Sequence, residues 1–233
     1  MKVEEVFKKA KNKKMELMIK SVYRFNTGLD LNKKEENLLI ETLDAMTKID
    51  RKYFCDNKQY ADTALPIGEG QTISQPSTVA RMIVLAGVGE GEELLEVGTG
   101  SGWNAAILSY LVGEKGKVES IERISILTEK ARANINMCRK DLGDEDCLRN
   151  INLLSGNIFY REDKKEYDRI IFTAGIEEGG ESKVENIADK FLKEDGRLVC
   201  PYKSGPILIY DNKDGELTKK MTDEKYSFVS LIE

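Results

Sequence analysis

A glycine-rich turn within residues 93–106 contains the residue types best suited to binding a ligand. The segment reads ELLEVGTGSGWNAA, in which an apolar strand runs through three glycines into a helix. Gly98, Gly100 and Gly102 allow positive φ and leave space for a ligand beside the backbone, while the start of a helix offers unpaired N–H groups. The pattern predicts a clamp for a cofactor.

An acidic residue downstream of the turn indicates what part of a cofactor it would hold. Glu122 lies 20 residues after Gly102, at the end of the strand-like run 117–121. A carboxylate at this place can bind the two hydroxyls of a ribose, so the pair indicates a nucleoside-containing cofactor. Tight packing alone is the plainer interpretation of the glycines. The run from Gly100 to Ala105 also fits the loose G-x-G-x-x-A dinucleotide pattern, which leaves the cofactor open at this point.

Composition limits the class of protein. The chain has 233 residues, 40% of them hydrophobic, which is enough for one domain with an ordinary core. Its net charge of −5 gives no sign of a generic nucleic-acid binder. It has no histidine, and its four cysteines form no C-x-x-C pair, so we expect neither a metal site nor a Cys–His nucleophile. No signal peptide or membrane-spanning run is visible, and we expect a cytoplasmic protein.

The N-terminal 25 residues differ from the rest in charge. They contain eight basic and three acidic residues. A solvated helix face is the plainer interpretation, and contact with RNA is the alternative.

The hydrophobic pattern predicts alternating strands and helices. We expect helices at 3–24 and 32–48, the second capped by Asn32 with Glu35 three residues on, and a loop from about 55 to 75. Pro76 opens a helix that ends near Gly87. Strands follow at 93–97, 117–121, 150–154, 168–172 and 197–200, with helices at 102–112, 125–141 and 181–192, and 207–210 pairs with 226–232 as a hairpin around Asp214-Gly215. This order predicts a parallel sheet with helices on both faces.

Three segments resemble a known family. Residues 64–76, ALPIGEGQTISQP, are similar to the P-I-G-x-G-Q-T-I-S-x-P segment of protein-L-isoaspartate O-methyltransferases. Residues 167–174, YDRIIFTA, and 192–201, LKEDGRLVCP, resemble two further strands of that family. The glycine turn resembles the E/D-x-G-x-G-x-G turn of class I S-adenosylmethionine (SAM) methyltransferases. The resemblance covers roughly residues 51–233.

The resemblance implies a fold and an activity. The fold is α/β, a doubly wound, mostly parallel Rossmann-like SAM methyltransferase sheet of order 3-2-1-4-5, with a C-terminal antiparallel hairpin and N-terminal helices. The expected division is an N-terminal helical extension at 1–55 and a methyltransferase domain at 56–233. The activity is methyl transfer from SAM, with S-adenosyl-L-homocysteine as product, to the free carboxyl of L-isoaspartyl residues in damaged proteins and peptides.

The resemblance also gives roles to individual residues. Ser74 is the expected catalytic residue, lying between the SAM methyl group and the acceptor carboxylate, although it could instead only cap the helix opened by Pro76. Asn157 stands where the family usually has Asp and accepts a hydrogen bond from the adenine amino group. The expected cofactor-binding residues are Gln71, Thr72, Ile73, Gly98, Thr99, Gly100, Ser101, Gly102, Glu122 and Asn157.

Several residues depart from the family pattern on what we expect to be the substrate side. Glu69 replaces an aromatic residue and puts a negative charge near an anionic acceptor. Cys55-Asp56 stand where Val-Pro is usual, and Gly175 where Ala is usual. Two alternatives therefore stay open: a related SAM methyltransferase acting on RNA or a small molecule, and a SAM-binding protein without turnover.

Overall fold

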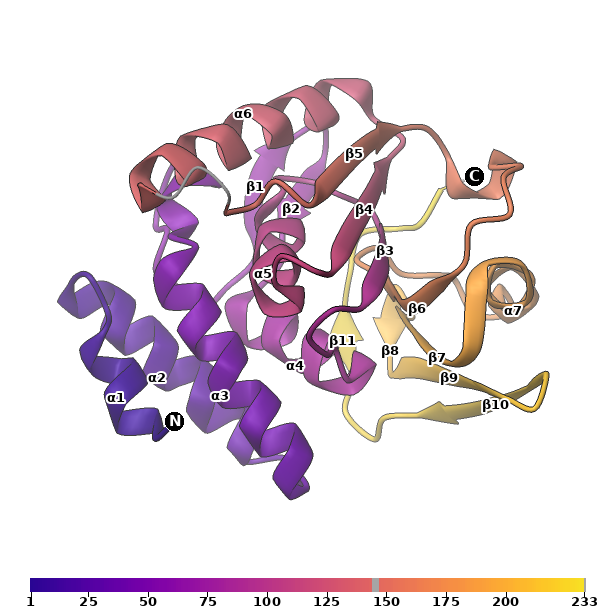
Figure 1. The fold of residues 1–233 in the computed structure, drawn as a ribbon, viewed down its shortest axis with the longest axis horizontal. Helices are drawn as coiled ribbons and strands as arrows, with labels where there is room; N and C mark the ends of the chain where they lie inside the picture. Colours follow the sequence, from indigo (N-terminus) through magenta and orange to yellow (C-terminus); the bar gives the residue numbers. More distant parts are fainter. Residues whose placement is uncertain (144–146, 233) are drawn as a thin grey trace.

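A seven-stranded sheet forms the centre of the computed structural model, which describes residues 1–143 and 147–232. Its strand order is β10-β9-β7-β6-β3-β4-β5 (Figure 1). The pairs within β5-β4-β3-β6-β7 are parallel, and β9 and β10 are antiparallel at one edge. The predicted order 3-2-1-4-5 with an edge hairpin is therefore confirmed. The strands are β3 (Glu93–Val97), β4 (Lys117–Glu122), β5 (Ile151–Ser155), β6 (Tyr167–Phe172), β7 (Leu192–Pro201), β9 (Ile207–Lys213) and β10 (Glu216–Met221).

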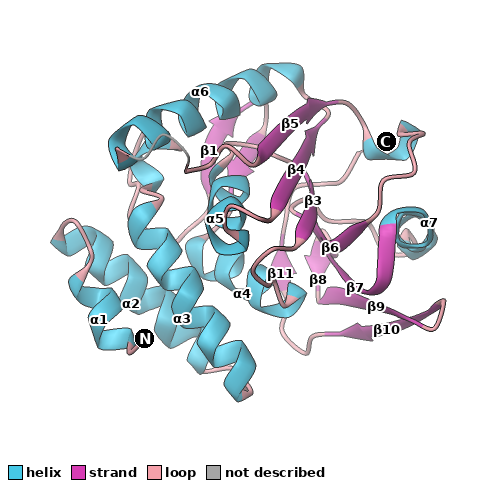
Figure 2. Cartoon of the chain, in the orientation of Figure 1, coloured by secondary structure: helices cyan, strands magenta, loops and turns pink. Residues whose placement is uncertain are grey.

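Helices cover both faces of this sheet (Figure 2). Neighbouring strand residues point to opposite faces, so Leu94 belongs to one buried cluster and Leu95 to the other. The first cluster takes side chains from α4 (Pro76–Ala86), α5 (Trp103–Val112) and α6 (Ser125–Leu142), and the second from α7 (Glu181–Phe191). This is the expected doubly wound arrangement.

Three helices lie within residues 3–48, where the sequence predicted two. The helix expected over 3–24 is divided into α1 (Val3–Lys8) and α2 (Lys13–Thr27), because the Asn12 side chain accepts a hydrogen bond from the Met15 N–H and starts a new helix. The helix expected over 32–48 is α3 (Lys33–Lys48), and its capping box between Asn32 and Glu35 is confirmed. Among the described helices, none is long and apolar enough to cross a bilayer.

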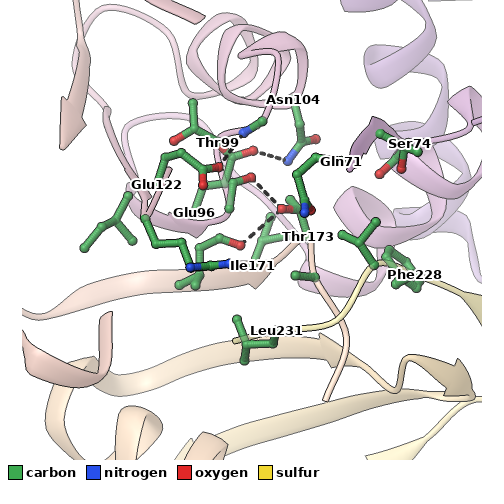
Figure 3. Close-up of a pocket in the computed structure, with 18 of the residues that line it drawn as sticks. Gln71, Ser74, Glu96, Thr99, Asn104, Glu122, Ile171, Thr173, Phe228 and Leu231 are labelled. Carbon is green, nitrogen blue, oxygen red and sulfur yellow. Dashed lines mark hydrogen bonds between the residues drawn. The ribbon is translucent and has the colours of Figure 1, made fainter. Parts of the chain in front are cut away.

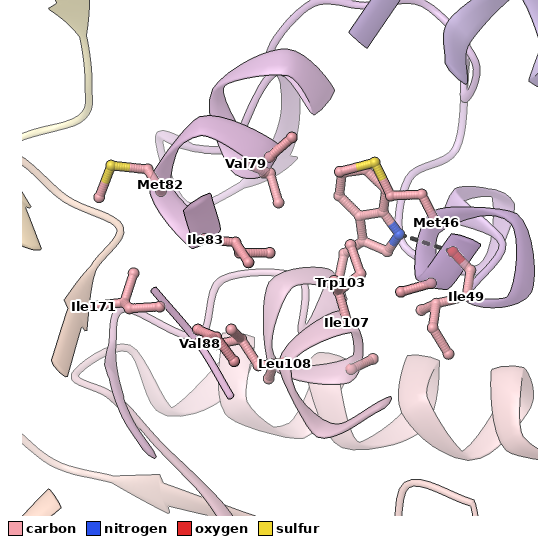
Figure 4. Packing of buried hydrophobic residues seen from close by; sticks show 14 of the residues in the cluster. Met46, Ile49, Val79, Met82, Ile83, Val88, Trp103, Ile107, Leu108 and Ile171 are labelled. Carbon is pink, nitrogen blue, oxygen red and sulfur yellow. Dashed lines mark hydrogen bonds between the residues drawn. The ribbon is translucent and has the colours of Figure 1, made fainter. Parts of the chain in front are cut away.

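Trp103 joins the N-terminal helices to the sheet. Its ring is buried, and its Nε1 donates to the Ile49 carbonyl oxygen at 3.0 Å. Met46 and Val79 lie around the same ring (Figure 4). One continuous buried cluster thus contains residues from before and after position 55, and we propose that 1–55 extends the folded unit of 56–233.

Short strands were missed in the segment that leads into α4. The segment expected to be a loop contains β1 (Leu65–Gly68) and β2 (Gln71–Ile73), preceded by a 3₁₀ turn, η1 (Arg51–Tyr53). Gly68, Glu69 and Gly70 all have positive φ, which allows the tight reversal between the two strands. These strands are too short to have given a hydrophobic period.

The C-terminal hairpin was placed correctly at its turn but not at its second strand. Asp214 and Gly215 form the turn, yet the partner of β9 is β10 rather than 226–232. Tyr226–Ser227, β11, instead pairs with β8 (Ser204–Gly205). β10 is mostly exposed, so it lacks the apolar alternation that favoured the later segment.

Trp103→Phe should lower the free energy of unfolding by about 2–4 kcal/mol, because the Ile49 carbonyl loses its donor and part of the ring volume is lost. Urea unfolding followed by circular dichroism measures this. As a control, Leu17→Ala on the exposed face of α2 should change the value by less than about 0.5 kcal/mol. If the two changes lowered the free energy of unfolding equally, Trp103 would not be the residue that joins the N-terminal helices to the sheet.

Candidate cofactor and acceptor pocket

A pocket opens at the carboxyl ends of β3, β4 and β6, and the strand order reverses between β3 and β6. Its empty volume is about 1020 Å³, part of which is open to solvent. Pockets of this size at such a reversal point hold small-molecule cofactors. In the view of Figure 3, Glu122 lies at one end and Ser74 at the other, with Thr99 and Thr173 between them.

The glycine turn has the backbone conformation that its sequence predicted. Gly98, Gly100 and Gly102 have φ of 101°, 52° and 86°. A Cβ on Gly98 would lie 2.3 Å from the Thr173 hydroxyl oxygen, so glycine is also needed there for space. Gly98, Thr99, Gly100 and Ser101 line the pocket.

Gly102 was predicted to bind cofactor, but it lies outside the pocket lining. A Cβ at this position would lie 3.1 Å from the Ala131 Cβ and from the Ile135 Cδ1 on α6. Glycine here allows the close packing of α5 against α6, and contact of Gly102 with the cofactor stays a prediction.

The Glu122 carboxylate is held in place by two backbone groups. Its Oε2 accepts from the Gly100 N–H at 3.0 Å, and its Oε1 accepts from the Ile124 N–H at 2.9 Å. The side chain is buried and lines the pocket. Each oxygen keeps a lone pair with which to accept from a ligand hydroxyl.

Glu96 is a second acid in the pocket wall, and the sequence gave it no role of its own. It is completely buried, with Asn104 Nδ2 donating to its Oε1 at 2.8 Å and the Ser120 hydroxyl contacting its Oε2. The Thr99 and Ser120 hydroxyl oxygens are 2.5 Å apart, which connects the acid to the turn. The pKa of Glu96 is raised to about 7, chiefly by burial and to a lesser extent by the nearby Glu122 charge, while the hydrogen bonds from Ser120 and Asn104 oppose the rise.

The opposite end of the pocket is formed by the segment that follows β1. Gln71, Thr72, Ile73 and Ser74 all line it, as the sequence predicted. Arg51 fixes this segment from behind, because its Nη2 donates to the Ser74 carbonyl oxygen at 3.1 Å.

Ser74 is not the cap of the helix that follows. The capping position of α4 is Gln75, and no side chain bonds from that position. Asp62, 15 residues before Ser77, takes the role by accepting from the Ser77 N–H at 2.9 Å and from its hydroxyl. The Ser74 side chain is therefore free of the capping role that the sequence left open.

The remaining pocket walls come from the loops after β5 and β6 and from the C-terminal segment. Asn157 lines the pocket as predicted; its Oδ1 accepts from the Phe159 N–H, and its Nδ2 donates to the Ile232 carbonyl oxygen at 3.4 Å. Thr173, Phe228 and Leu231 also line it and were not predicted. The sequence carries no local motif for the last two, which reach the pocket only through the path of the chain.

The departures from the family pattern lie outside the described lining of the pocket. Glu69, Cys55, Asp56 and Gly175 are absent from the described residues that line it. Glu69 is an exposed residue at the β1–β2 turn, and Cys55 is buried with its Sγ 3.6 Å from the Arg51 carbonyl oxygen. Contact of these residues with a bound peptide substrate stays a prediction.

Four of the eight basic residues of the N-terminus form ion pairs. Lys9 pairs with Asp44 at 2.6 Å, and Lys11 pairs with Asp141 at 2.7 Å. Lys13 and Lys20 both pair with Glu16. This pattern supports the solvated helix face over an RNA contact.

The fold and the pocket define a Rossmann-like protein of the class I methyltransferase type. Residues 29–233 match the family model described as protein-L-isoaspartate(D-aspartate) O-methyltransferase. The chain belongs to this family.

Proteins named protein-L-isoaspartate O-methyltransferase are similar in sequence to most of this chain. The protein-L-isoaspartate O-methyltransferase of Pyrococcus abyssi is 41% identical over 203 residues, 83% of this chain and 87% of the relative. That of Ignicoccus hospitalis is 38% identical over 204 residues, 83% of this chain and 89% of the relative.

Two solved structures share the fold. One, named protein-L-isoaspartate O-methyltransferase, has a TM-score of 0.72 and 26% identity, covering 94% of this chain and 66% of the other. A second, from Plasmodium falciparum, is a candidate enzyme of that name in complex with S-adenosyl-L-homocysteine; its TM-score is 0.74 at 22% identity, covering 92% and 96% of the two chains.

Glu96→Gln should change how stability depends on pH. Because the folded state raises the pKa of Glu96 from 4.5 to about 7, folding binds a proton in this window, and stability falls as pH rises from 4.5 to 7. The loss is on the order of 3 kcal/mol and should be absent in Glu96→Gln. Urea unfolding at pH 4.5, 6 and 7.5 measures it. As a control, Glu129→Gln at an exposed position should show the same pH dependence of the free energy of unfolding as the original chain. If Glu96→Gln also showed that dependence, Glu96 would not be the group with the raised pKa.

Proposed function

We propose that this protein transfers a methyl group from SAM to the free carboxyl of L-isoaspartyl residues in damaged proteins and peptides. The observation that supports this proposal most strongly is that two segments predicted from the sequence to bind ligands line the same pocket. The glycine turn with Glu122 forms one end, and the segment Gln71–Ile73 with Ser74 forms the other. The named relatives carry the same activity in their names.

The cofactor end fits an adenosyl group. The Glu122 oxygens, oriented by the N–H groups of Gly100 and Ile124, would accept from ribose hydroxyls. Asn157 would accept from the adenine amino group with the second lone pair of its Oδ1. When bound, SAM supplies an electrophilic methyl group on a positively charged sulfur.

The acceptor end requires positioning rather than proton transfer. A carboxyl with a pKa near 4 is already ionised at pH 7, which explains how a chain without histidine performs the reaction. The Ser74 hydroxyl would donate to one carboxylate oxygen and leave the other directed at the methyl group. Orientation of this kind contributes up to about 7–11 kcal/mol in favourable intramolecular models.

We also propose that the protein is located in the cytoplasm. Cys55, Cys138 and Cys200 are buried thiols that form no disulfide, as expected in a reducing compartment.

A labelled-methyl assay tests the activity directly. The protein should transfer label from SAM to an isoaspartyl peptide and leave the matching aspartyl peptide at background, because the extra backbone atom changes where the carboxyl lies. Transfer to neither peptide would contradict the proposal, and transfer to RNA or a small molecule from a cell extract would favour the related methyltransferase. SAM binding without any transfer would identify a protein without turnover.

Substitutions at the two ends of the pocket should separate turnover from affinity. Ser74→Ala should lower kcat by about 100-fold, because a positioned donor is lost, and should change the Kd for S-adenosyl-L-homocysteine by less than about threefold. Glu122→Ala should raise that Kd by about 10–100-fold with a smaller effect on kcat. Calorimetry and initial rates give both values.

A second variant at position 122 distinguishes loss of the ribose contact from disturbance of the glycine turn. Glu122→Ala also removes the acceptor for the Gly100 and Ile124 N–H groups, whereas Glu122→Gln keeps one acceptor oxygen. Equal losses of kcat and affinity in Ser74→Ala and Glu122→Gln would show that the two roles are misassigned.

A further inference from the structure

Three segments meet behind one wall of the pocket. They are 173–176 after β6, 201–205 from the last residue of β7 through β8, and the C-terminal segment 226–231. We call the place where they meet the three-segment joint. Gly175 is its centre: its N–H donates to the Val229 carbonyl oxygen at 2.8 Å, and its carbonyl oxygen accepts from the Leu231 N–H at 2.7 Å. Phe228 N–H donates to the Lys203 carbonyl oxygen at 2.9 Å, which ties the second and third segments together.

The joint leaves no space for a side chain at position 175. A Cβ there would lie 2.5 Å from the Lys203 nitrogen, 2.6 Å from the Lys203 Cα and 2.6 Å from the Tyr202 carbonyl carbon. All three are backbone atoms, so the conflict can be relieved only by moving the segment 201–205 or the segment 173–176. Both segments hydrogen-bond to the C-terminal segment, so either movement would shift it. Gly175 is needed for space and not for conformation, since it is not among the residues with positive φ.

The same joint carries a wall of the pocket. Thr173 and Ala174 precede Gly175 and line the pocket, and the C-terminal residues 228–232 line it from the other side of the joint. In Figure 3, Phe228 lies at the Ser74 end, away from Glu122. Phe228 is half-buried and packs against the first hydrophobic cluster, so it presents part of an apolar surface at the acceptor end.

We propose that Phe228 selects isoaspartyl peptides with an apolar residue beside the damaged one, and that Gly175 is the positioning residue that sets where Phe228 lies. This inference rests on the proposed function and names the acceptor class more closely. A charged neighbour would lose water against the Phe228 ring without gaining a partner, whereas an apolar neighbour gains contact area. A side chain at 175 would move 201–205 or 173–176, and either movement would shift the C-terminal segment that contains Phe228.

Kinetics with two isoaspartyl peptides test the selection. The peptides differ only in the residue after the isoaspartyl, Leu in one and Glu in the other. For the original chain, kcat/KM should be about tenfold higher with Leu, the value of one apolar contact in a binding pocket. Phe228→Ala should reduce the ratio to about two or less by lowering the rate with the Leu peptide. An unchanged ratio in Phe228→Ala would overturn the inference while leaving the proposed function intact.

Gly175→Ala tests the positioning role, with Gly89→Ala as the matched control. The variant should raise KM for the Leu peptide about tenfold, with kcat and the Kd for S-adenosyl-L-homocysteine changed by less than about threefold. A Cβ on Gly89 meets a side chain, that of Glu92 at 3.3 Å, rather than backbone, and Gly89 lies outside the described lining of the pocket, so Gly89→Ala should leave all three constants unchanged. Equal changes in KM and cofactor Kd would show a general structural defect and overturn the role of Gly175.

The Phe228→Ala ratio can be interpreted even if the Gly175→Ala variant does not fold. Should Gly175→Ala lose its native circular dichroism spectrum, the Phe228→Ala ratio alone decides the selection, because that change leaves the backbone contacts of the joint in place. Failure of the original chain to methylate either peptide would overturn the proposed function and this inference with it.

Discussion

The buried guanidinium of Arg51 is the contact on which the acceptor end of the pocket depends. It donates to four backbone carbonyl oxygens, those of Gln59, Ala61, Thr63 and Ser74, at 3.0–3.1 Å, and it lies 5.1 Å from the centre of the Trp103 ring. A buried cation is costly unless its donors are satisfied, so the irregular segment 59–63 must keep the path that supplies those oxygens. The pocket loop is thereby fixed to the start of α5 and to the glycine turn.

The fold was predictable wherever short-range signals agree. The β3 strand, its glycine turn and the capping box of Asn32 and Glu35 depend on neighbours within a few residues, and all three were predicted correctly. The β1–β2 hairpin was missed because its strands have only three or four residues and its turn reads as a loop. The hairpin partner was misplaced because the exposed strand β10 has no apolar alternation.

The residues of the site were likewise predicted where they belong to a local motif and missed where they do not. The residues of the glycine turn, Glu122 and the Gln71–Ile73 segment have local motifs, and they meet in one pocket apart from Gly102. Phe228 and Leu231 reach the pocket only because Gly175 admits the C-terminal segment at close range, a packing fact that no pattern of neighbours contains. Asp62 replaced Ser74 at the start of α4 for a similar reason, since it arrives from a distant loop.

The buried acid beneath the glycine turn changes its charge near neutral pH. The chain has no imidazole, the group that usually changes charge near neutrality. With its pKa at about 7, Glu96 takes that place, and the hydroxyls of Ser120 and Thr99 must reverse their donor direction when it gains or loses a proton. A change of pH across neutrality would therefore alter the polarity of the turn that grips the methyl donor.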